Sequence, residues 1–197
     1  MNAEDPASPD FWSTRYAAGK TPWDLRGVPA ALIAFLDRSS SRGTVLIPGC
    51  GSGYEIRAFH DAGWDVTAID FAPGAIERAR AVLGPLASRV QMGDFFAPEF
   101  GGRFDLIYER TFLCALLPSR WSEYAGRMTE LLSEGGRLAG VFVYGEASGG
   151  PPFPMPEGRE KELFAEHFHL TRSEPLSPSL PVFEDMEERW QEWTRTS

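Results

Sequence analysis

At residues 45–54 the chain reads Val45-Leu46-Ile47-Pro48-Gly49-Cys50-Gly51-Ser52-Gly53-Tyr54. The apolar run Thr44–Ile47 predicts a buried strand, and Tyr54–Ala62 predicts a helix that ends at Gly63. Glycines between a strand and a helix allow the backbone to turn sharply and to approach a ligand without a Cβ in the way. The N-terminus of the helix behind them offers free N–H groups and a positive dipole end. This turn suits a carboxylate or a phosphate equally well, and on its own it also fits a purely structural role.

Strand and helix patterns alternate outward from this turn. The alternation predicts an α/β fold whose parallel sheet has helices on both faces and right-handed crossovers. The last patterned segment, Met186–Thr194, fits an edge strand or a helix. Helices are expected at Val28–Asp37, at Pro73–Leu83 with Gly84 at its end, at Arg120–Leu132 with Gly135-Gly136 closing it, and at Arg159–His167, and strands at Trp64–Ile69, Arg89–Met92, Phe104–Tyr108, Arg137–Tyr144 and Phe168–Glu174.

The length of 197 residues suits one domain, which we place at residues 27–197. Residues 1–10 are expected to form a loose tail. Residues 11–26 carry four aromatic side chains around a Gly19-Lys20 turn, more than a tail needs. We therefore treat residues 1–26 as a separate N-terminal segment, with the aromatic residues Phe11, Trp12, Tyr16 and Trp23.

Charge and composition exclude several classes of partner. The net charge of −9 argues against nucleic acid, since phosphate backbones select basic surfaces. The apolar runs are too short to cross a bilayer, and residues 1–10 do not resemble a secretory signal. Cys50 and Cys114 form neither a disulfide framework nor a metal-ligand spacing. We expect a cytoplasmic protein without a metal, monomeric, acting on a small molecule.

Carboxylates follow the second and third expected strands. Asp70, at the end of the second strand, can accept both hydroxyls of an adenosine ribose, and it can also cap the helix that follows. After the third strand, Asp94 can accept from an adenine amino group while Phe95 offers its backbone N–H and a ring. A simple turn explains Asp94 and Phe95 equally well.

The three strand ends are expected to meet at the carboxyl edge of the sheet, where open α/β sheets bind ligands. Such a crevice holds an adenosine with a short charged tail. A dinucleotide needs room for a second nucleotide, for which the remaining chain offers little. No Lys-Ser/Thr pair follows the glycines, which argues against phosphoryl transfer from a nucleotide triphosphate. S-adenosylmethionine, with S-adenosylhomocysteine as its product, fits what remains.

The chain resembles the thiopurine S-methyltransferase family, and within it the halide and thiol methyltransferase branch. The likeness runs from Phe11 to about Phe168 and implies a class I methyltransferase: a Rossmann-like, seven-stranded, mostly parallel sheet whose reversed last strand is Met186–Thr194. The strings that carry the likeness are Gly19-Lys20-Thr21-Pro22-Trp23-Asp24, Ile47-Pro48-Gly49-Cys50-Gly51-Ser52-Gly53-Tyr54, Asp94-Phe95-Phe96, Phe104-Asp105-Leu106-Ile107-Tyr108, Leu117-Pro118-Ser119-Arg120 and Gly149-Gly150-Pro151-Pro152.

The resemblance also implies roles for single residues. The N-terminal aromatics would form a lid over the cofactor, Gly49 would contact its aminoacyl part, and Arg120 would stand on the substrate side. Two positions depart from the family pattern. Glu109-Arg110 stands where halide-type members carry Asp-Tyr, and it is closer to the Asp-Arg pair of the thiopurine branch. Tyr16 stands where the family more often has Trp. The cofactor set is then Trp12, Tyr16, Trp23, Gly49, Gly51, Gly53, Asp70, Asp94, Phe95 and Glu109.

The expected reaction is an in-line methyl transfer to a small soft nucleophile, such as a thiol, a thiopurine-like heterocycle, a halide or a chalcogen anion. Aromatic walls exclude water and attract a sulfonium through cation–π contact. Phe112 and Phe153 are candidates for the acceptor side, and Arg120 with Arg110 for the catalytic side, although Glu109 and Arg110 could instead pair with each other. Methyl transfer to oxygen or nitrogen on the same fold, and a non-catalytic adenosyl-binding module, remain open alternatives.

Overall fold

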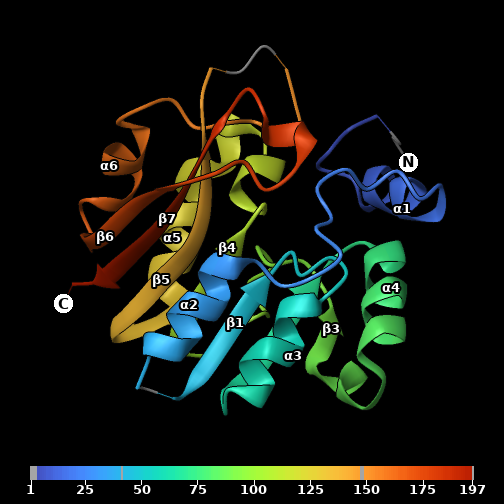
Figure 1. Ribbon diagram of the computed structural model, residues 1–197, viewed down its shortest axis with the longest axis horizontal. Helices are drawn as coiled ribbons and strands as arrows, with labels where there is room; N and C mark the ends of the chain where they lie inside the picture. Colours follow the sequence, from blue (N-terminus) through green and yellow to red (C-terminus); the bar gives the residue numbers. More distant parts are fainter. Residues whose placement is uncertain (1–3, 41, 147–148, 197) are drawn as a thin grey trace. The chain divides into compact units, whose positions relative to one another are not determined.

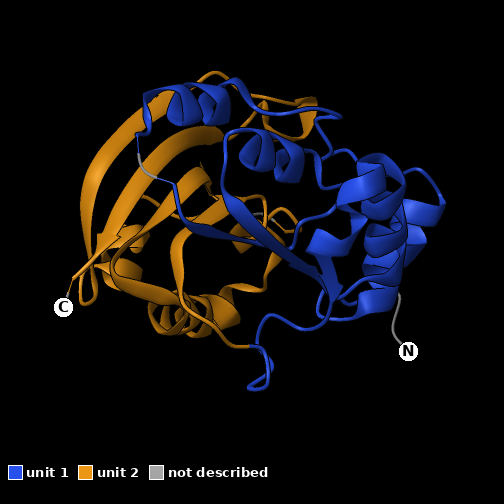
Figure 2. Ribbon diagram, turned by 90° about the horizontal axis from the view of Figure 1, so that it is seen from below, with its two compact units in different colours: residues 1–100 blue, residues 101–197 orange. Residues whose placement is uncertain are grey.

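The computed structural model describes residues 4–40, 42–146 and 149–196 (Figure 1). The chain forms two compact units, residues 1–100 and residues 101–197, which Figure 2 distinguishes by colour. Residues 1–3 of the expected tail lie outside the described residues.

The first unit carries three parallel strands in the order β3-β2-β1. Strand β1 is the apolar run of the sequence, and Val45, Leu46 and Ile47 in it are buried. Helices α3 and α4 follow β1 and β2, as in a βαβ unit. The elements are α1 (Pro9–Ala17), α2 (Ala30–Arg38), β1 (Thr44–Pro48), α3 (Tyr54–Asp61), β2 (Asp65–Asp70), α4 (Pro73–Leu83), the 3₁₀ helix Gly84–Arg89 and β3 (Val90–Met92).

Helix α1 was not expected from the sequence. It begins inside residues 1–10, the expected loose tail. Ser8 is its N-cap and accepts a hydrogen bond from the backbone N–H of Asp10 at 3.3 Å. Pro9 occupies the first helical turn, where its missing N–H costs nothing. The expectation failed because the aromatic residues of this helix do not form a regular apolar stripe. The Ser8-Pro9-Asp10 start signal was nevertheless present.

The second unit carries four strands in the order β4-β5-β7-β6. Strand β5 runs parallel to β4, whereas β7 runs antiparallel to both β5 and β6. Its core centres on the ring of Phe164, whose centroid lies 5.2 to 6.3 Å from four other rings. The elements are β4 (Phe104–Arg110), the 3₁₀ turns Leu113–Ala115 and Pro118–Arg120, α5 (Trp121–Leu131), β5 (Leu132–Tyr144), α6 (Arg159–Phe164), β6 (Phe168–Leu176), the 3₁₀ turn Pro181–Phe183 and β7 (Glu187–Arg195).

Two segments of the second unit differ from what the sequence suggested. The Gly135-Gly136 pair does not close helix α5; it lies inside β5, which starts directly after the helix at Leu132. The segment that fitted either helix or strand is strand β7. In β7, Trp190 and Trp193 are buried and the polar neighbours Glu188 and Gln191 are buried with them, so a strict polar–apolar alternation was not available to identify the strand.

The seven strands follow the order β3-β2-β1-β4-β5-β7-β6, and the last strand in the sequence is the reversed one. The Rossmann-like α/β class with a seven-stranded sheet and a reversed last strand is therefore confirmed. Of the helices in the described ranges, none is both long and apolar enough to span a membrane.

Candidate functional site

The glycine-rich turn connects β1 to α3 in the first unit. Gly49, Gly51 and Gly53 all have positive φ angles, 56°, 53° and 74°. Gly53 is the N-cap of α3 and has no side chain with which to cap the helix. The turn therefore presents backbone at a helix N-terminus, an arrangement that binds the carboxylate or phosphate end of a ligand.

Asp70, the last residue of β2, holds this turn in place. Its Oδ2 accepts a hydrogen bond from the backbone N–H of Gly51 at 3.0 Å, and its Oδ1 accepts one from Ala72 at 2.9 Å. Ala72 is the N-cap of α4, so the carboxylate joins the glycine turn to the start of the next helix. Burial raises the pKa of Asp70, while the backbone donors act in the opposite direction. Asp70 is not the N-cap of α4, because Ala72 holds that position and no side chain caps the helix; the carboxylate contacts the chain just before the helix begins.

The segment after β3 contacts the main chain of Asp70. The backbone N–H of Gly93 donates to the carbonyl oxygen of Asp70 at 3.0 Å. Asp94 is exposed, and its Oδ1 accepts from the backbone N–H of Phe96 at 2.9 Å, which forms a local turn. The ring of Phe95 is buried and packs edge to face on Phe96. The structure therefore brings the glycine turn, Asp70 and Asp94 together within the first unit, with the Asp94 side chain accessible and the Phe95 ring in the core.

Three half-buried aromatic side chains of the N-terminal segment pack against one another. Trp23 contacts Trp12 and Tyr16 edge to face, at centroid distances of 5.3 and 6.0 Å. A hydrogen bond from the side chain of Trp23 reaches the Tyr16 hydroxyl, and burial raises the pKa of that hydroxyl. The hydroxyl of Tyr16 lies above Gly51: a Cβ added at Gly51 would be 2.8 Å from it. Tyr16 thus lies at the glycine turn, and Trp23 joins it to Trp12.

A hydrogen bond also joins the N-terminal segment to the glycine turn, and the sequence did not predict it. The hydroxyl of Ser52 donates to Oδ2 of Asp24 at 2.6 Å, and Oδ1 of Asp24 accepts from the backbone N–H of Arg26 at 2.7 Å. Ser52 is buried. Both residues belong to the strings that carry the family resemblance, which was the available signal, although no role had been assigned to either.

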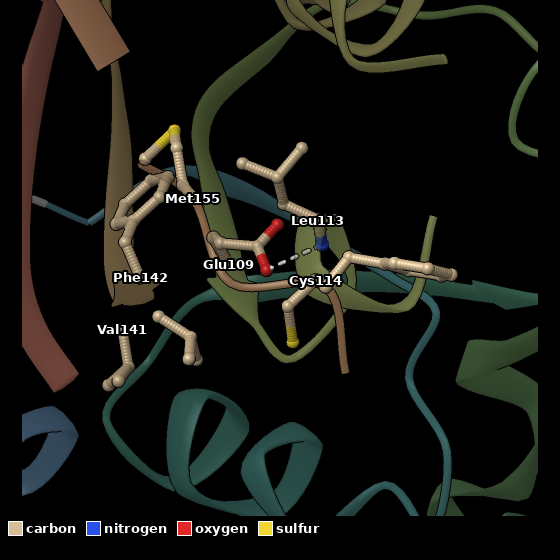
Figure 3. A pocket seen from close by; sticks show the side chains of 8 residues that line it. Glu109, Leu113, Cys114, Val141, Phe142 and Met155 are labelled. Carbon is tan, nitrogen blue, oxygen red and sulfur yellow. Dashed lines mark hydrogen bonds between the residues drawn. The ribbon is translucent and has the colours of Figure 1, made fainter. Parts of the chain in front are cut away.

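The second unit contains a hollow at the end of β4 (Figure 3). It has room for about one water molecule. The polar lining groups are the Glu109 carboxyl and the Cys114 thiol. The lining residues are Glu109, Leu113, Cys114, Val141, Phe142, Val143, Phe153 and Met155.

Glu109 is the buried acid of this hollow, with 1% of its surface exposed. Its Oε1 accepts from the backbone N–H groups of Phe112 and Leu113 at 2.9 and 3.0 Å, and its Oε2 accepts from the hydroxyl of Tyr124 at 2.7 Å. Burial raises the pKa of Glu109 to about 7, although the three donors act in the opposite direction. These three donors hold its carboxylate.

The loop between β5 and α6 forms one wall of the hollow. The backbone N–H of Phe153 donates to the carbonyl oxygen of Cys114 at 2.7 Å, and Met155 donates to Val143 at 2.8 Å. Phe153, a candidate for the acceptor side, therefore lines the hollow. Phe112, the other candidate, has its ring 6.0 Å from that of Tyr124 and is not among the lining residues.

The two arginines expected on the catalytic side lie outside the lining of the hollow. Arg120, in the 3₁₀ turn before α5, donates from Nε to Oε2 of Glu123 at 2.8 Å. Arg110 is the last residue of β4, and its charge lowers the pKa of the Cys114 thiol against the larger raising effect of burial. Arg110 thus lies close enough to the hollow to influence the Cys114 thiol, although it does not line the hollow.

The sequence matches the family model described as thiopurine S-methyltransferase over residues 7–196. Among known proteins, a probable thiol methyltransferase 2 of Arabidopsis thaliana is 38% identical over 151 residues, which are 73% of this chain and 66% of that protein. The chain thus spans slightly less than two thirds of that relative. A thiopurine S-methyltransferase of Vibrio cholerae serotype O1 is 30% identical over 177 residues, 79% of this chain and 80% of that protein.

Solved structures share the fold at lower sequence identity. The magnesium protoporphyrin IX methyltransferase of Synechocystis PCC 6803, crystallised with bound SAM, superposes with a TM-score of 0.75 at 16% identity, and the match covers 100% of both chains. This likeness supports the fold alone. The substrate has to be inferred from the residues of the site.

Proposed function

Because the chain belongs to the thiopurine S-methyltransferase family, we propose that it transfers the methyl group of S-adenosylmethionine to a small soft nucleophile. The acceptor classes are a thiol, a thiopurine-like heterocycle, a halide and a chalcogen anion. The single observation that carries the proposal is the junction of the glycine turn with Asp70, where the Gly51 N–H donates to the Asp70 carboxylate at 3.0 Å.

The residues at this junction fit an adenosyl donor. The turn and the N-terminus of α3 suit the carboxylate of its amino-acid part, and the exposed Asp94 suits its adenine amino group. The Asp70 carboxylate accepts from the backbone N–H groups of Gly51, Ala72 and Phe71, and its roughly four lone-pair sites leave one for a ribose hydroxyl. Bound there, the donor supplies a methyl group on a positively charged sulfur. No phosphate-binding lysine follows the turn, which favours this donor over a nucleotide triphosphate.

The aromatic segment serves as the lid of this site. Ring faces attract a positive sulfur, and the segment is fastened to the glycine turn by the Ser52–Asp24 hydrogen bond. Trp12, Tyr16 and Trp23 exclude water, so charges of opposite sign can be neutralised in a medium of low dielectric constant. The protein's role in this reaction is alignment and the exclusion of water.

The acceptor is held by residues that follow β4 and β5. The hollow beside Glu109 has mostly apolar side chains in its lining, and it has room for about one water molecule. Arg120 and Arg110 are the candidates for holding an anion near it. In this structure Arg120 is bound to Glu123, a partner that it would exchange for the acceptor.

The test is methyl transfer from labelled S-adenosylmethionine to iodide, hydrosulfide and an aromatic thiol, measured side by side with a phenol and an amine. We expect methylated product with at least one soft acceptor and little with the oxygen and nitrogen acceptors. Trp23→Ala should weaken S-adenosylhomocysteine binding, and Arg120→Ala should reduce the rate with anionic acceptors. Product with the phenol or amine alone would contradict the proposal.

A calorimetric titration distinguishes the remaining classes of protein. A methyltransferase binds S-adenosylhomocysteine and does not need NAD. Tight NAD binding without S-adenosylhomocysteine binding would point to an oxidoreductase. S-adenosylhomocysteine binding without turnover of any acceptor would point to a non-catalytic binding module.

A further inference from the structure

We propose that the Tyr16 hydroxyl donates a hydrogen bond to the carboxylate at the amino-acid end of the donor, and that this contact makes the site selective for donors that carry the carboxylate. This inference rests on the proposed function and assigns a specificity-determining residue within its donor site. The observation that carries it is the place of the hydroxyl at Gly51, 2.8 Å from the point that a Cβ there would occupy. Both residues belong to the first unit.

Close packing of helix α1 on the start of α4 fixes the position of Tyr16. A Cβ added at Gly74 would lie 3.1 Å from the Cβ of Tyr16 and 3.1 Å from the Cα of Ser13, so the helices approach where α4 carries only a hydrogen. The hydroxyl of Ser13 accepts from the backbone N–H of Gly74 at 3.3 Å. The ring of Trp23 packs edge to face on that of Tyr16, with 6.0 Å between the centroids. The half-buried side chain of Tyr16 is thus held against the glycine turn by its own helix and by Trp23.

The hydroxyl of Tyr16 has a proton to offer to a ligand. An indole group can only donate, so the hydrogen bond with Trp23 uses a lone pair of the hydroxyl oxygen and leaves its proton. Two carboxylates act on the hydroxyl, those of Asp70 and Asp24. These carboxylates accept from backbone N–H groups and from the hydroxyl of Ser52. The O–H of Tyr16 is therefore the donor that this segment presents at the glycine turn.

The environment of Tyr16 keeps its hydroxyl neutral. Burial is the largest cause that raises the pKa of Tyr16, and the nearby Asp70, Asp24 and Cys50 raise this pKa further, against the hydrogen bond from Trp23. An ionised tyrosine would repel a carboxylate, whereas a neutral one donates to it. Tyr16 therefore stays a hydrogen-bond donor near neutral pH.

The carboxylate is the group of the donor that suits this hydroxyl. At the amino-acid end of the donor, the carboxylate accepts hydrogen bonds, while the ammonium and sulfonium groups are positively charged and do not. Backbone N–H groups at the start of α3 favour an anion at the turn, and the Tyr16 hydroxyl adds a side-chain donor at Gly51. The ammonium group, on the same carbon as the carboxylate, suits the negative charges of Asp24 and Asp70.

The decisive variant is Tyr16→Phe, which removes the hydroxyl and keeps the ring. Its ligands are S-adenosylhomocysteine and decarboxylated S-adenosylhomocysteine, which keeps the amine and lacks only the carboxylate. We expect Tyr16→Phe to weaken binding of the first about 10-fold and of the second less than about 2-fold, because a hydrogen bond to a charged group is lost only with the first. Calorimetry measures the first affinity, and competition against S-adenosylhomocysteine measures the second.

Trp23→Phe tests whether the indole N–H orients the hydroxyl. This variant should weaken S-adenosylhomocysteine binding about 3-fold in the wild-type background and have almost no effect in the Tyr16→Phe background, because the two groups act as a unit. Tyr54→Phe is the matched control. It removes the same group from a tyrosine of the same unit whose hydroxyl is bonded to Arg78, and it should leave the affinity unchanged.

Two results would overturn the inference while leaving the proposed function intact: an equal loss of affinity for both ligands in Tyr16→Phe, or wild-type affinity of that variant for S-adenosylhomocysteine. A crystal structure with S-adenosylhomocysteine is an independent measurement, in which more than about 3.5 Å between the Tyr16 hydroxyl and the nearest carboxylate oxygen would also overturn it. A wild-type protein that binds neither ligand would overturn the proposed function and the inference with it.

Discussion

The hydroxyl oxygen of Tyr16 lies 2.8 Å from the point that a Cβ on Gly51 would occupy. The aromatic segment and the glycine turn are therefore in contact where only a hydrogen fits between them. Gly51 also has a φ of 53°, which side-chain-bearing residues adopt with strain. Gly51 is thus constrained both by its own backbone conformation and by Tyr16 of the N-terminal segment.

Gly51→Ala should weaken S-adenosylhomocysteine binding by about 10-fold or more, because the methyl group adds backbone strain and displaces Tyr16. In a Tyr16→Phe background, which lacks the hydroxyl, the same substitution should cost less. Calorimetric titration of the four proteins measures this coupling. Equal losses in both backgrounds would show that the Tyr16 contact has no effect.

Ser52→Ala should loosen the N-terminal segment with little effect on the rest of the chain. The hydroxyl of Ser52 donates to Asp24 at 2.6 Å, and a bond of this kind contributes about 1 kcal/mol. Hydrogen exchange of residues 11–26 should become faster while that of β5 and β7 stays unchanged. Ser88→Ala, at an exposed position of the same unit, is the control. Unchanged exchange in Ser52→Ala would contradict the fastening role.

Asp70→Ala should weaken S-adenosylhomocysteine binding about 100-fold and leave the ratio of activities on two acceptors nearly constant. The substitution removes the hydrogen bonds that the carboxylate accepts from the backbone of Gly51, Ala72 and Phe71, together with the expected contact to the ribose. Asp37→Ala, at an exposed site on α2, is the control. Undiminished affinity in Asp70→Ala would show that the ribose assignment is wrong.

Glu109 should make the protein less stable as the pH rises. Its pKa is about 7 in the folded chain and near the ordinary 4.5 in the unfolded chain, so between these values the folded state binds more protons. The free energy of unfolding should therefore fall by up to about 3 kcal/mol from pH 4.5 to above pH 7, a fall that Glu109→Gln should lack. Urea unfolding of both proteins across this range measures the difference, and parallel curves would contradict it.

Most of the fold followed from local patterns because these patterns report burial and turn chemistry directly. Thr44–Ile47 is apolar and β-branched, and it is the buried strand β1. Pro73 and Gly84 bound α4 at the positions expected for these residues. The reversed strand β7 needed the family resemblance, since buried Glu188 and Gln191 obscure its pattern and depend on partners distant in the sequence.

The candidate site was predictable where it rests on backbone geometry and less so where it rests on side-chain partners. Gly51 and Gly93 both donate hydrogen bonds to Asp70, as expected for segments that follow the ends of neighbouring parallel strands. The Asp24–Ser52 bond and the Glu109–Tyr124 bond join residues 28 and 15 positions apart, and no periodic pattern reports such contacts. The sequence left open whether Glu109 pairs with its neighbour Arg110, and it did not indicate the hydrogen bond to Tyr124.

The most direct test of the donor site is a crystal structure with S-adenosylhomocysteine. We expect the ribose hydroxyls to lie within hydrogen-bond distance of the Asp70 carboxylate, with the amino-acid end on the Gly49–Gly53 turn and the adenine beside Asp94. A ligand bound elsewhere, with these three stretches free of contact, would contradict it.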